Sequence, residues 1–173
     1  MIGKLTGIVD EIGTDFAVID AVLPCVDGGR FAAKRIAGER VEIEAHCFTD
    51  GHDVLRVMLR WRQEKDKESR EVEMQALGND RWSAGFTPPS PGRYYYTVTA
   101  WVDHFESWHH ELERRVDVDD IRSAALSGAE LIEAAAARAG SEDGKALRAW
   151  AANLRADAGR KAGDAKAIKV LAP

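Results

Sequence analysis

Apolar and polar side chains alternate with a period of two through much of the first 120 residues. The alternation is clear in five runs, residues 41–48, 54–62, 72–76, 82–86 and 93–103. Because successive side chains of a strand point to opposite faces, we expect five strands that each bury one face. Alternation from Trp108 to Val118 predicts one further strand.

Segments with turn chemistry separate these runs. Asp50-Gly51-His52-Asp53 and Gly78-Asn79-Asp80 suit short connections, and residues 87–92 contain prolines, which cannot donate to a strand ladder. We find no helical pattern before residue 120, which argues against parallel βαβ units. The pattern predicts an immunoglobulin-like antiparallel β-sandwich over residues 21–120. Residues 1–20 are predicted to form an N-terminal β-hairpin extension.

The last 53 residues change to a helical period, so the expected fold is mainly β with a C-terminal helical hairpin. Apolar residues recur at helical spacing over 121–139, and Gly140-Ser141 then breaks the helix, with Ser141 as the predicted N-cap of the next one. A third helical segment is expected over 164–171. This region, 121–173, either packs on the sandwich or forms a subunit surface. In the second case the candidate dimer contacts are Leu147, Trp150 and Leu154.

The net charge of the chain limits the kinds of molecule that it is expected to bind. The chain has 173 residues, with 24 basic and 29 acidic side chains and a net charge of -5. An acidic chain argues against broad nucleic-acid binding, which needs dense lysine and arginine. No apolar run approaches the roughly 20 residues of a membrane-spanning helix. We find no secretory signal, and two cysteines make no disulfide framework, so we expect a cytoplasmic protein with reduced thiols.

The residue types that carry chemistry do not form a known catalytic or metal-binding pattern. The five histidines lack the short fixed spacings of zinc ligands, and adjacent pairs such as His109-His110 point to opposite faces of a strand. The sequence contains neither a serine nucleophile elbow nor a phosphate-binding glycine loop. We therefore assign no catalytic, cofactor-binding or metal-binding residue.

Aromatic residues are the remaining candidates for a binding site. Most of them are expected to fill the core between the two sheets, because Trp61, Trp82 and Tyr96 fall on the apolar side of their alternations. Tyr95 and Trp101 share the opposite face and could stack against the apolar faces of sugar rings. A free-standing α-glucan-binding module is therefore an alternative function.

Several ordered motifs resemble the α-1,4-glucan:maltose-1-phosphate maltosyltransferases of bacterial glycogen metabolism. The resemblance covers about residues 16–170 and is carried by segments 26–35 (VDGGRFAAKR), 50–53 (DGHD), 78–82 (GNDRW), 96–103 (YTVTAWVD) and 128–131 (GAEL). It implies the N-terminal, non-catalytic domain of that family, an immunoglobulin-like sandwich with a helical insertion that takes part in homodimer formation. The implied partners are a second copy and the catalytic α-amylase-like barrel of the parent enzyme.

The barrel and its paired carboxylates do not occur in this sequence, so we expect the chain alone to be inactive. A second resemblance is confined to residues 1–20 (MIGKLTGIVD and the following Ile19-Asp20), which look like the start of the junction-binding subunit of the bacterial branch-migration complex. It implies a junction-DNA-binding fragment as a further alternative, against which the acidic first half of the chain argues.

Overall fold

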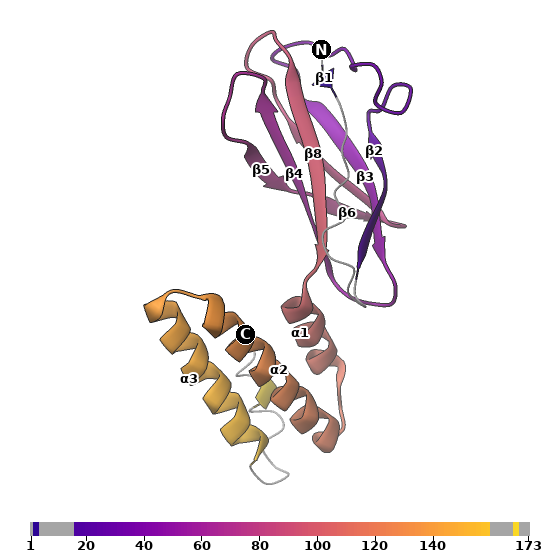
Figure 1. Cartoon of the computed structure of the whole chain (residues 1–173). Helices are drawn as coiled ribbons and strands as arrows, with labels where there is room; N and C mark the ends of the chain where they lie inside the picture. Colours follow the sequence, from indigo (N-terminus) through magenta and orange to yellow (C-terminus); the bar gives the residue numbers. More distant parts are fainter. Residues whose placement is uncertain (1, 4–15, 160–167, 170–173) are drawn as a thin grey trace. The chain divides into compact units, whose positions relative to one another are not determined.

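The computed structural model describes residues 2–3, 16–159 and 168–169, and it divides into two compact units, Met1–Val102 and Asp103–Pro173 (Figure 1). The first unit contains the strands and the second the helices. The division lies between Val102 and Asp103, whereas the change from alternation to a helical period predicted a boundary at residue 120.

The first unit is built from two four-stranded sheets. One sheet has the order β1 (Ile2–Gly3), β8 (Tyr94–Val102), β4 (Leu55–Gln63) and β5 (Arg70–Glu73). The other has the order β2 (Ala17–Leu23), β3 (Val41–Thr49), β7 (Arg81–Phe86) and β6 (Gln75–Gly78). Every pairing is antiparallel except that of β1 with β8. The predicted mainly antiparallel β-sandwich is therefore confirmed.

Alternating side chains of both sheets form the core of the sandwich. Ile43, Val57 and Leu59 are completely buried, as their positions in the alternation predict. The indole of Trp61 stacks on the ring of Phe86 with their centroids 4.5 Å apart. The predicted inward positions of Trp61 and Tyr96 are thus confirmed, and Trp82 is partly buried against the same core.

A nine-residue segment ties the two sheets together along one side. Strands β5 and β6 belong to different sheets, and a single residue, Met74, separates them. Met74 is 2% exposed, and its backbone N–H donates to the carbonyl of Val57 at 2.8 Å. The chain therefore crosses from one sheet to the other at a buried side chain.

The described parts of residues 1–20 lie in both sheets. Strand β1 pairs with β8, and β2 pairs with β3, so these two strands do not pair with each other. Residues 4–15, which would contain the turn of the predicted N-terminal hairpin, lie outside the described residues.

The second unit contains α1 (His104–Arg114), α2 (Val118–Arg138) and α3 (Ser141–Ala158). The strand predicted over 108–118 is wrong, because residues 104–114 form a helix. Trp108 and Leu112, its two buried residues, are four positions apart, a spacing that fits one face of a helix as well as one face of a strand. The Asp103 carboxylate caps the helix by accepting from the N–H of Glu106 at 3.0 Å.

Helices α2 and α3 confirm the predicted helical hairpin. The break lies at Ala139-Gly140, and the N-cap of α3 is Gly140 instead of the predicted Ser141, which is the first helical residue. Of the third predicted helical segment, Ile168 and Lys169 are helical, and the remaining residues of 164–171 lie outside the described part of the chain.

Candidate functional site

Two of the motif segments meet at one end of the sandwich. The connection after β3 contains residues 50–53, and the turn between β6 and β7 contains Asn79 and Asp80. The N–H of Cys47 donates to the carbonyl of Asp80 at 2.8 Å, and Nε1 of Trp82 donates to the carbonyl of Cys47 at 3.1 Å. These hydrogen bonds hold the turn against the end of β3.

The turn itself requires a left-handed backbone. Gly78, Asn79 and Asp80 have φ values of 85°, 51° and 60°. Glycine, asparagine and aspartate are the residues that adopt this region at least cost, which explains the GND sequence. The conformation places Asn79 and Asp80 at the rim of a depression in the surface.

We call this depression the hollow, with a volume of about 290 Å³. Its polar lining includes Thr49, Asp53, Asn79 and Asp80, and its aromatic lining consists of Phe48 and Trp82. Small-molecule sites typically measure about 300–1,000 Å³, so the volume of the hollow lies just below that range.

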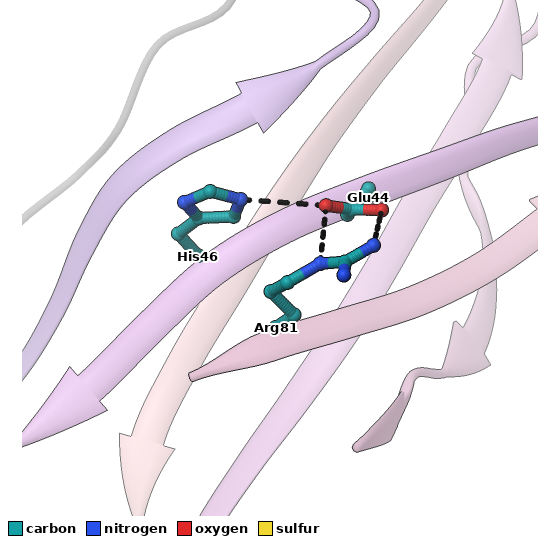
Figure 2. A network of polar contacts seen from close by, with 3 residues as sticks. All are labelled: Glu44, His46 and Arg81. Carbon is teal, nitrogen blue, oxygen red and sulfur yellow. Dashed lines mark hydrogen bonds and ion pairs between the residues drawn. The ribbon is translucent and has the colours of Figure 1, made fainter. Parts of the chain in front are cut away.

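An ion-pair network lies beside the hollow on the outer face of the sheet (Figure 2). Both oxygens of the Glu44 carboxylate accept from Arg81, at 2.8 Å each, and His46 Nε2 lies 3.3 Å from the first oxygen. The hydrogen bond from Arg81 holds the pKa of Glu44 below its ordinary value. Arg81 also lines the hollow. Because Glu44 accepts through both oxygens, this guanidinium is fixed in position and links β3 to β7.

A buried cysteine, Cys47, is also among the residues that line the hollow. Cys47 is 1% exposed, and burial raises the pKa of its thiol to about 11. A thiol that stays protonated is a poor nucleophile, so Cys47 is inert in the folded protein.

We expect Cys25, which is exposed, to react with a disulfide reagent such as Ellman's reagent at least about a hundredfold faster than Cys47, because Cys47 must first be uncovered by unfolding. Single-thiol variants Cys47→Ala and Cys25→Ser assign the fast and slow phases. Equal rates in the two variants would contradict the buried position of Cys47.

The structure does not bring the two candidate sugar-stacking residues together. Tyr95 and Trp101 lie on the same face of β8, but they are six positions apart, about 20 Å along a strand. The hydroxyl of Tyr95 donates to Glu64 at 2.9 Å, and the guanidinium of Arg62 covers its ring. Trp101 is 45% exposed. The two rings therefore form separate positions and not one platform.

The three candidate dimer residues occupy different depths of the helical unit. Leu154 is completely buried in the core of that unit, so it cannot contact a second subunit while the unit is folded. Leu147 and Trp150 are partly buried against the same core. Unlike Leu154, both of these side chains keep some exposed surface.

Within residues 2–3, 16–159 and 168–169, no group of three or more histidine, cysteine, aspartate or glutamate side chains could hold a metal ion. No helix of this part of the chain is long and apolar enough to cross a membrane.

Sequence reasoning missed the hollow, although it singled out both segments that line it. The missing information was the strand register, in which His46 lies opposite Arg81 and so brings the end of β3 to the β6–β7 turn.

Comparison with known proteins identifies similar sequences over almost the whole chain. Residues 16–172 match the family described as α-1,4-glucan:maltose-1-phosphate maltosyltransferase, domain N/S. The chain is 43% identical over 155 residues to the maltosyltransferase of that name from Myxococcus xanthus, covering 84% of this chain and 23% of the relative.

Two further relatives carry the same name. The Chlorobaculum tepidum protein is 44% identical over 131 residues, which is 75% of this chain and 20% of the relative. The Pseudomonas aeruginosa protein is 33% identical over 143 residues, which is 80% of this chain and 21% of the relative. The chain therefore spans between a fifth and a quarter of the length of these relatives.

Proposed function

Because this chain belongs to the α-1,4-glucan:maltose-1-phosphate maltosyltransferase family, whose domain N/S it matches, we propose that it is the non-catalytic assembly domain of such an enzyme. Its role is to pair two copies, and its natural partner is the catalytic portion that extends α-1,4-glucans with maltosyl units in the bacterial cytoplasm. The observation that carries this proposal is the match of residues 16–172 to domain N/S of this family, in relatives that are four to five times as long as the matched region.

The chemistry of glycosyl transfer supports a non-catalytic role. Transfer with retention uses two carboxyl groups about 5 Å apart across the scissile bond. No aspartate or glutamate of this sequence falls in a motif that would give it such a role. We therefore expect no release of phosphate from maltose 1-phosphate when the purified chain is mixed with glycogen, and measurable release would overturn the non-catalytic assignment.

The helical unit offers the surface for pairing. Leu147 and Trp150 lie one turn apart on α3 and are only partly covered by the core of their own unit. On α2, Leu126 is 46% exposed. Of these three side chains, the indole of Trp150 is the type most often found to contribute strongly to the affinity of protein interfaces.

Light scattering tests the proposal directly. We expect a solution mass of twice the 19.0 kDa monomer. Trp150→Lys should raise the dimer dissociation constant at least about tenfold, because it places a charge in an apolar contact. Ala152→Lys is the matched control, since residue 152 is exposed and lies on the opposite side of α3. A monomeric wild-type chain would remove the assembly function.

A further inference from the structure

The loop between β2 and β3 is an exposed surface that combines cations with apolar side chains. We call residues 24–36 the basic loop, because it contains Arg30, Lys34 and Arg35 against a single acidic residue, Asp27. Three of its apolar side chains are exposed, with exposed fractions of 43% for Val26, 57% for Phe31 and 64% for Ile36. Exposed apolar groups within one short segment are typical of an interaction surface.

Backbone and side-chain contacts give the basic loop a defined shape. Val26 and Phe31 form a β-bridge, and the hydroxyl of Tyr96 donates to the carbonyl of Pro24 at 2.5 Å. Just beyond the loop, the N–H of Gly38 donates to the carbonyl of Pro88 at 2.8 Å. A preorganised loop binds with a smaller loss of conformational entropy than a mobile one.

The hollow has the complementary chemistry. Asp53 and Asp80 line it, and neither carboxylate has an ion-pair partner within the described residues. The rings of Phe48, which is 39% exposed, and Trp82 form the aromatic part of its lining. Carboxylates beside aromatic rings suit a guanidinium or ammonium group, which gains both charge pairing and a cation–π contact. Apolar side chains next to that cation would cover the rings.

The basic loop and the hollow cannot meet within one copy of the sandwich. The loop leads into the first residue of β3, Val41, and the hollow is lined by the last three, Cys47, Phe48 and Thr49. A strand of nine residues separates the two sites by roughly 30 Å. Figure 1 shows both connections of β3 at opposite ends of the sandwich.

We propose that two copies of this chain pair with their sandwiches antiparallel, so that the basic loop of each copy docks on the hollow of the other. A two-fold axis across the strands forms both contacts at once and closes the assembly, as isologous dimers require. The pairing rests on the proposed assembly function. The charges fix the register of the two copies.

Exchange of charge between the two sites tests this pairing. One variant reverses the basic loop, Lys34→Glu with Arg35→Glu, and a second reverses the hollow, Asp53→Lys with Asp80→Asn. Asparagine is used at position 80 because it tolerates the positive φ of 60°. A third variant carries all four substitutions. Asp20→Arg is the control, a charge reversal at an exposed position of β2. Sedimentation equilibrium gives the dimer dissociation constant of each folded variant.

We expect the variant with the reversed basic loop and the variant with the reversed hollow each to raise the dimer dissociation constant at least about tenfold, because like charges then face each other across the contact. The dissociation constant of the variant with all four substitutions should return to within about threefold of the wild-type value, and Asp20→Arg should leave the constant unchanged. The antiparallel pairing would be overturned if the dissociation constants of the two charge-reversed variants were unchanged. It would also be overturned if combining all four substitutions did not restore dimer affinity. A wild-type monomer would instead contradict the assembly function itself, so the two failures are distinct.

Discussion

Gly128→Ala is expected to unfold the helical unit at room temperature or to destabilise it by about 3 kcal/mol. A Cβ atom at residue 128 would lie 2.0 Å from Cζ2 and 2.2 Å from Cε2 of Trp108. The indole cannot withdraw, because it is 7% exposed and its Nε1 donates to the carbonyl of Ala124 at 2.7 Å. In the variant, therefore, either α1 moves away from α2 or the buried hydrogen bond from Trp108 to Ala124 breaks.

Chemical unfolding followed by far-ultraviolet circular dichroism measures this effect, since the helices dominate the signal. Gly140→Ala is the matched control. Gly140 has a φ of -60°, and a Cβ there would meet nothing within 4 Å, so this substitution should cost less than about 1 kcal/mol. Equal stability of the two variants would contradict the close packing of Trp108 on α2.

Leu154→Asp is the second substitution for which we expect a large loss of stability, at least about 4 kcal/mol. Leu154 is completely buried in the hydrophobic core of the helical unit, and the buried Asp157, one turn further along α3, adds a like charge to any carboxylate at position 154. A carboxylate there loses its hydration without gaining a partner. The expected result is an unfolded helical unit, and not a folded monomer.

Thermal unfolding of Leu154→Asp distinguishes these outcomes, because the sandwich is a separate compact unit and should keep its own transition. Asn153→Asp, the same charge at the exposed neighbouring position, is the control and should change the stability by less than about 0.5 kcal/mol. A variant that keeps full helicity but loses its partner would show that Leu154 lies at a subunit surface after all.

The strands of the sandwich were predictable because each is buried on one side only. In β3 the completely or almost completely buried Val41, Ile43, Ala45 and Cys47 alternate with more exposed residues, and that alternation is directly visible in the sequence. The same argument fails for α1. Its buried residues are only Trp108 and Leu112, and a separation of four residues satisfies both the strand and the helix period.

The hollow could not be predicted for a different reason. Its lining comes from segments about 25 residues apart in sequence, and only the pairing of β3 with β7 brings them together. The burial of Leu154 is a similar case, since a helical period shows which residues share a face but not how deeply each of them is covered. Depth depends on the neighbouring helices, here α1 and α2.

The crossing of the chain at Met74 also bears on aggregation. An exposed sheet edge can recruit strands from other molecules and grow into fibres. Strands β5 and β6 form one edge of each sheet, so a single bent segment of nine residues occupies two edges of the sandwich. Each strand has only four residues, and Glu71 and Glu73 on β5 pair with Arg60 and Arg56 of β4. Two edge strands of four residues each, one of them carrying ion pairs to its neighbour, give an incoming strand little to pair with, which protects this side of the sandwich from polymerisation at high concentration.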